Sequence, residues 1–193
     1  MCGHDVRALD RRELLGLLGT GAVVAVAGCA SDDDGGDNGA QAYDPNVEDH
    51  PGDEPIEFTD DQSCPVCAMT PSNYSQWYAQ LAHENGEGAV FDTTGCLFAY
   101  LVANTADSDV AGAWAVDSGT GDLVDATDAH FVLITDSTTI DDPMTINPRT
   151  FADEDDALEF VEGWEPEELT EDDIIEFDEI DYDAASIYRE NRI

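Results

Sequence analysis

The stretch Ser63–Thr70, which reads SCPVCAMT, holds two thiols and one thioether within six residues. Thiolates and thioethers are soft ligands, which select Cu(I) over metals that prefer oxygen. The methionine two residues after Cys67 argues against zinc, because zinc sites use cysteine, histidine and carboxylate ligands. A CxxC pair is also typical of redox dithiols and structural disulfides. The stretch therefore indicates either a copper site or a disulfide beside a buried methionine.

The residues that follow predict an α+β fold with mostly antiparallel strands. Apolar runs bounded by turn residues indicate five short strands and two helices. The strands are expected at 77–82, 89–91, 113–116, 123–124 and 130–135, and the helices at 93–104 and 153–162. The first helix is apolar nearly all round and should be buried. The order of these elements suggests two degenerate copies of one unit, with a boundary near residue 112.

The charge of the chain excludes nucleic acid as a partner and indicates a medium of high salt concentration. The chain has 45 acidic residues against six basic ones, all arginine, and a formal net charge of −39. Nucleic acid is excluded, because phosphate contacts need lysine and arginine. Apolar runs and three tryptophans argue against a disordered acidic protein. We therefore expect a folded protein adapted to high salt, where the short Debye length screens self-repulsion.

Residues 1–29 have the features of an export signal. Arg11 and Arg12 precede a short apolar stretch, as in twin-arginine signals, and this stretch is too short and glycine-rich for a confident spanning helix. It ends in Val26–Cys29, which resembles a lipobox, so Cys29 would carry a lipid and become the mature N-terminus. The alternative is an uncleaved N-terminal anchor. Both place the rest of the chain at the extracytoplasmic face of the cell membrane.

Two polar segments flank the predicted domain at 57–165. Residues 30–56 are rich in Ser, Asp, Gly, Asn and Pro and predict a flexible acidic tether. His50 in this segment is expected to be solvated. Residues 166–193 are acidic again. The apolar residues within 174–180 suggest one more short strand or helix that docks on the domain, and we expect the last ten residues to be loosely held.

Three further residues are candidates for the site around the CxxC pair. Cys96 falls in the first turn of the expected helix, where the positive end of the helix dipole favours a thiolate, although a small core residue would also suit this position. His130 begins a strand and is either a ligand or a strand end. Met144 lies in a loop, which is unusual because methionine normally fills cores.

Several stretches resemble, in the same order, the NosL family of copper-binding lipoproteins that serve the assembly of nitrous-oxide reductase. These stretches are Cys64–Met69, Trp77–Leu81, Phe91–Leu101, Val116–Gly121 with Val124–Ala126, and Pro143–Met144. The resemblance implies a membrane-anchored Cu(I) chaperone in denitrification rather than an enzyme. Its partner would be a copper enzyme or the maturation and transport complex of that enzyme. The resemblance also implies two strand-strand-helix-strand subdomains.

The same resemblance assigns residues to the metal site. It implies Cys67 and Met69 as the centre of the site, with Cys64 and Met144 as further ligands. Cys96 matches a position that is commonly cysteine. The family usually has glycine where this chain has Ala68 and Thr145, and both changes stiffen a loop because glycine alone is free at positive φ.

Other functions fit the residues less well. A redox dithiol of the thioredoxin type needs a CxxC at a helix start after a strand of a parallel sheet, and neither is evident. An electron-transfer copper site needs two histidines with a cysteine and an axial methionine, and His83 and His130 lack the usual spacing. A nucleophile-base pair, a phosphate loop or a pair of catalytic carboxylates does not stand out, so catalytic residues are not predicted.

Overall fold

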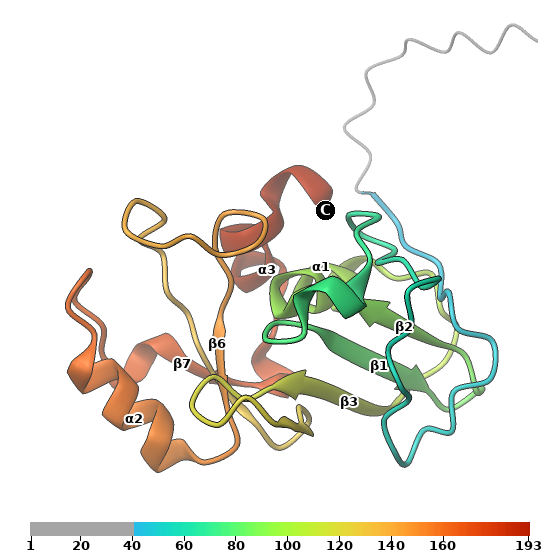
Figure 1. Cartoon of the computed structure of the whole chain (residues 1–193), viewed down its shortest axis with the longest axis horizontal. Coiled ribbons are helices and arrows are strands. Elements are labelled where there is room, and N and C mark those ends of the chain that lie inside the picture. Colours follow the sequence, from blue (N-terminus) through green and yellow to red (C-terminus); the bar gives the residue numbers. More distant parts are fainter. Residues whose placement is uncertain (1–40) are drawn as a thin grey trace, which may run out of the picture. The chain divides into compact units, whose positions relative to one another are not determined.

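The computed structural model describes residues 41–193. The predicted export signal, with Arg11, Arg12 and Cys29, and the first part of the predicted tether lie outside the described residues. Within the described part of the chain, no helix is both long and apolar enough to cross a membrane. Residues 41–193 form an α+β fold of two antiparallel sheets with helices packed against them (Figure 1).

The first sheet has four antiparallel strands in the order β2-β1-β3-β4. They are β1 (Ala79–His83), β2 (Gly88–Phe91), β3 (Val110–Val116) and β4 (Leu123–Asp125). The turn between β1 and β2 places Gly86 at a φ of 87°, which glycine adopts without steric cost. Every residue of β1 and β2 is buried, since helix α1 packs on the sheet and Gln80 bonds to residues 50 and 56.

Helix α1 (Thr94–Ala103) begins directly after β2 and is buried, as its apolar sequence predicts. All of residues 94–100 are buried. Phe98 contacts Phe131 of β5 edge to face, with ring centroids 5.3 Å apart. One hydrophobic core therefore continues from the first sheet into the second.

The second sheet repeats the topology of the first. Its strands are β5 (His130–Val132), β6 (Arg149–Phe151) and β7 (Ile174–Glu176), in the order β6-β5-β7, with α2 (Glu154–Gly163) before β7. Each unit places its first strand in the centre, the hairpin partner on one side and the strand after the helix on the other. The predicted boundary near residue 112 falls inside β3, whose pairing with β1 and β4 holds it in the first sheet. The last strand of the first sheet, β4, ends at Asp125, and the first strand of the second sheet, β5, begins at His130.

Residues 41–52 form a strap along the first sheet, although the sequence predicts a flexible tether here. Val47 forms an antiparallel bridge with Gly88 at the start of β2. Tyr43 is buried, and its backbone bonds to Ala103, the last residue of α1, and to Thr105. A Cβ at Gly88 would lie 2.6 Å from the Leu81 carbonyl and 2.9 Å from the His50 ring, so glycine allows the strap to approach closely.

His50 fixes the far end of this strap. It is buried rather than solvated, with 4% of its surface exposed. Its ring stacks on Trp114 with centroids 5.4 Å apart, and its Nε2 shares a hydrogen bond of 2.9 Å with Gln80 Oε1. A few anchoring residues are enough to dock this polar, acidic stretch on the sheet.

The acidic C-terminal segment is also packed against the domain, so the expectation of loosely held final residues is wrong. Helix α3 (Tyr182–Arg189) begins at Asp181, whose side chain accepts a hydrogen bond of 3.0 Å from the Ala184 amide. It packs against α1, with Tyr188 edge to face on Phe98. The short 3-10 helices are η1 (Pro71–Tyr74), η2 (Glu171–Asp173), η3 (Phe177–Glu179) and η4 (Glu190–Arg192).

The loop before β6 has an unusual backbone. Met144 and Thr145 have φ values of 59° and 87°, in the left-handed region that β-branched residues rarely adopt. The Thr145 amide donates to the Asp142 carbonyl over 3.2 Å. Ala68 in the cysteine loop also has a positive φ, of 63°. Both positions where the NosL resemblance predicts glycine therefore have a backbone conformation that glycine favours.

We predict that acidification weakens the domain through His50. Burial lowers the pKa of His50, so below about pH 6.5 the unfolded chain binds this proton more readily than the folded protein. This contribution to stability is present above that pH and is lost as the pH falls. Urea unfolding at pH 7.5 and 5.5 should show a larger loss for the parent than for His50→Gln. Equal losses would contradict the prediction.

We also predict that Thr145→Gly stabilises the domain by about 1 kcal/mol, because glycine removes the left-handed strain. Thr145 is exposed, so the substitution removes little packing. Thr145→Ala is the matched control: it keeps the Cβ and should gain much less. Urea midpoints report the difference. A Thr145→Gly protein no more stable than the alanine variant would show that the backbone here is unstrained.

Candidate metal centre

The cysteine loop, residues 64–69, is a closed turn. The Cys64 amide donates to the Met69 carbonyl and the Ala68 amide donates to the Cys64 carbonyl, each over 2.8 Å. The positive φ of Ala68 lets the chain reverse within so few residues. Val66 is buried in the core, so the loop is anchored at a residue between its two cysteines.

A third thiol and a carboxylate join this loop from the junction of β2 and α1. One ligand atom from each of Cys64, Cys67, Asp92 and Cys96 lies within 4.8 Å of the others. Cys64, Asp92 and Cys96 are buried, whereas Cys67 is partly exposed. The three cysteines are free thiols. We call these four residues the thiol cluster; it offers three sulfur donors and one oxygen donor to a single ion.

Protons are divided unevenly within the thiol cluster. Hydrogen bonds from Cys64 and Cys67, together with the nearby Arg189, hold the pKa of Cys96 well below its ordinary range in spite of burial. Burial raises the pKa of Cys64. The hydrogen bond from Cys64 lowers the pKa of Cys67, but contact with Cys96 and burial raise it overall. Cys96 therefore ionises first, and a metal that binds the other two thiols must displace their protons.

Asp92 is a site residue that the sequence analysis missed. Its Oδ1 accepts a hydrogen bond of 3.0 Å from the Cys67 thiol, while its buried Oδ2 has no partner. Burial, and then the charge of Cys96, raise its pKa to about 6. A buried oxygen without a partner is costly, so Oδ2 fits a position beside a cation. The sequence did offer one indication of this role: Asp92 is an acidic residue between an expected strand and an expected buried helix, four residues before Cys96.

The loop that carries Met144 packs at the same end of α1 as Cys96. Asn147 Oδ1 is 2.9 Å from where a Cβ on Gly95 would lie, so the missing side chain leaves room for the loop. Asn147 Nδ2 donates to the Pro143 carbonyl over 2.8 Å. Met69 and Met144 are both half-buried.

The histidines lie elsewhere. His130 begins β5 and lies outside the thiol cluster, where it lines two hollows together with acidic residues such as Glu154 and Glu176. His83 is buried, with Nε2 sharing a hydrogen bond of 3.0 Å with the Tyr100 hydroxyl. Within residues 41–193, the structure does not bring two histidines together with a cysteine, as an electron-transfer copper site requires.

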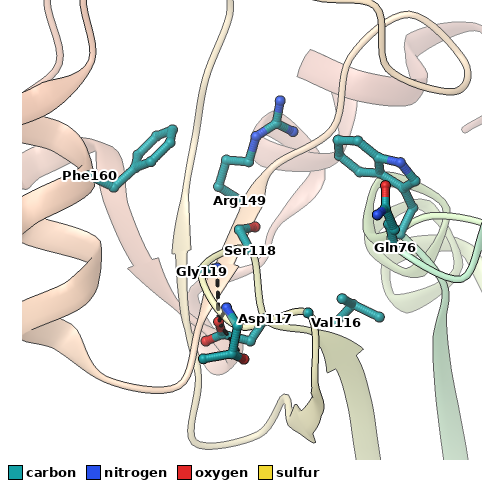
Figure 2. A pocket seen from close by; sticks show the side chains of 10 residues that line it. Gln76, Val116, Asp117, Ser118, Gly119, Arg149 and Phe160 are labelled. Carbon is teal, nitrogen blue, oxygen red and sulfur yellow. Dashed lines mark hydrogen bonds between the residues drawn. The ribbon is translucent and has the colours of Figure 1, made fainter.

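A separate hollow of about 390 Å³ lies beside the loop after β3 (Figure 2). It is lined by Gln76, Trp77, residues 116–121, Arg149 and Phe160. Arg149 lies over the Trp77 ring, 4.8 Å from its centroid, and its Nη1 is 2.8 Å from Asp142 Oδ2. The lining residues carry no sulfur, so this hollow does not suit a soft metal.

Comparison with known proteins places the chain in a family. The sequence model of the NosL family matches residues 55–184, which is more than half of the chain. The crystal structure of the copper chaperone NosL from Shewanella denitrificans is similar, with 17% sequence identity and a TM-score of 0.52 over 67% of this chain and 97% of that chain. At this identity the likeness shows a shared fold. A search of curated proteins gave no match. By the family match, the chain belongs to the NosL family.

Proposed function

We propose that this protein is an extracytoplasmic Cu(I) chaperone, anchored to the membrane through a lipid on Cys29. It would supply copper for the maturation of nitrous-oxide reductase or a related copper enzyme. The observation that carries the proposal is the thiol cluster, whose three free thiols lie within 4.8 Å of one another. Membership of the NosL family and a fold shared with a copper chaperone support it.

Cu(I) is the proposed cargo because the donor set is soft. Thiolate and thioether sulfur select Cu(I), whereas the single carboxylate is a hard ligand that adds little affinity for it. We propose Cys67 and Met69 as the central ligands, joined by Cys64 and by Met144. Cys96 and His130 are additional candidates, of which Cys96 belongs to the thiol cluster.

Partial exposure of Cys67 suits the release of the ion. Cys64 and Cys96 are buried, so an incoming ligand of the recipient reaches the ion from the side of Cys67. A thioether binds more weakly than a thiolate and carries no charge, so it can leave without taking up a proton. Transfer then proceeds by exchange of ligands, and the oxidation state of the copper does not change.

A redox or structural dithiol is the alternative, favoured by the close approach of Cys64 and Cys67 in an oxidising compartment. The CxxC pair does not open a helix after a strand, however, and both sheets are antiparallel. Thiol titration of the purified protein separates the two proposals. A Cys64–Cys67 disulfide that survives mild reductant would favour the alternative.

The proposed setting is the outer face of a cell membrane in a high-salt medium. The net charge of −39 is self-repulsive at low ionic strength and is screened when salt shortens the Debye length. We therefore propose that the acidic surface is an adaptation to the salt of the medium, and that the thiol cluster determines which metal ion is carried.

We predict that Cys67→Ser weakens Cu(I) binding by more than about 100-fold, beyond the loss typical of an outer-shell partner. Met69→Ala should bind Cu(I) with a smaller loss, because a thioether is the weaker donor. Competition with a Cu(I) chelator under reducing conditions measures both. Ser63→Ala, at the exposed residue before the loop, is the control and should match the parent. Parent-like affinity in Cys67→Ser would refute the proposed function.

A further inference from the structure

Arg189 is a buried cation at the end of α3, with 3% of its surface exposed. Its Nε lies 3.3 Å from Cys96 Sγ. Its other donors reach oxygen atoms of the surrounding segments. They bond to Thr93 Oγ1 (2.7 Å), Asn147 Oδ1 (2.6 Å) and the carbonyls of Ile146 (3.2 Å) and Tyr188 (2.7 Å). None of these acceptors is a carboxylate, and the Cys96 sulfur is the one that can ionise.

Among the residues that the structure describes, the charge of Arg189 has no carboxylate partner. A guanidinium is charged at every accessible pH, and a buried charge is costly unless an opposite charge compensates it. Within residues 41–193, the ion pair found joins Arg149 and Asp142, and Arg189 has no acidic oxygen within 4.0 Å. In a chain with 45 acidic residues, this buried guanidinium faces sulfur instead.

The contacts of Arg189 join three segments around the thiol cluster. Thr93 is the N-cap residue of α1, yet its hydroxyl accepts from Arg189 and does not cap the helix. Asn147 accepts from Arg189 and also holds the Pro143 carbonyl of the loop that carries Met144. Three residues further on, Arg192 donates to the Val66 carbonyl within the cysteine loop, over 3.1 Å. Arg189 and Arg192 thus contact both the helix residue and the loop that supply the thiols.

We propose that Arg189 is a positioning residue of the copper site, which fixes Cys96 and offsets the negative charge of the thiolates around the bound ion. This inference rests on the proposed function. A monovalent ion held by two or three thiolates is an anionic centre, and further negative charge is unfavourable in this acidic chain. The Arg189 guanidinium is the cation that contacts the cluster sulfur, and its planar fork reaches Cys96 and the oxygen atoms around it at once.

The test is a double-mutant cycle on the dissociation constant for Cu(I), measured by chelator competition on the full domain. Arg189→Leu, which removes the charge without adding a sulfur donor, should weaken binding by about 10–100-fold, the range for a charged hydrogen bond. In a Cys96→Ser background the loss should be smaller by more than about threefold, which exceeds the scatter of independent sites. Arg189→Lys, which keeps the charge, should lose less than Arg189→Leu.

Arg149→Leu is the control, since it removes the guanidinium of a second, partly buried arginine that pairs with Asp142. Any effect of Arg149→Leu on Cu(I) binding should be the same with and without Cys96. Circular dichroism reports folding of each variant. Should Arg189→Leu fail to fold, the cycle is run with Arg189→Lys, whose loss should again shrink in the Cys96→Ser background.

Equal losses in both backgrounds would overturn the role of Arg189 as a positioning residue of Cys96. That outcome leaves the proposed function intact, provided that the parent binds Cu(I). A parent that does not bind Cu(I) would instead refute the proposed function itself.

Discussion

The close approach of three thiols and Asp92 in the interior is the contact on which the rest of the structure depends. Two thiols come from a short loop that is reversed by a positive φ at Ala68, and the third comes from the first turn of a buried helix. Bringing donors of partial negative character together is unfavourable unless a proton or a cation is shared among them. The cluster therefore makes sense as a place that exchanges protons for a metal ion.

The two repeated units contribute different residues to the metal site. Both place their first strand between the second and the third, yet only the first unit carries cysteines within the described residues. The second unit and the C-terminus contribute the loop with Met144, Asn147 and the buried Arg189. The shared core through Phe98 and Phe131 holds the two units together. The two similar units thus contribute different residues to one site.

The sequence predicted the elements whose signal is local. Turn residues and apolar runs located the β1–β2 hairpin, α1 and α2 to within a few residues, and the spacing of Cys64, Cys67 and Met69 indicated soft-metal chemistry. The docked strap, α3 and Asp92 were not predicted. For the strap and α3, the signal is one residue in an acidic stretch, such as Tyr43, His50 or Arg189, whose role depends on a distant partner. A polar residue becomes a core residue only when tertiary structure supplies the bond that satisfies it.

X-ray absorption at the copper edge of the Cu(I)-loaded domain tests the central claim most directly, because it counts sulfur against nitrogen and oxygen neighbours. The account predicts one copper ion per chain with a first shell made mainly of sulfur atoms. A shell dominated by nitrogen or oxygen, or the absence of stoichiometric binding under reducing conditions, would contradict it.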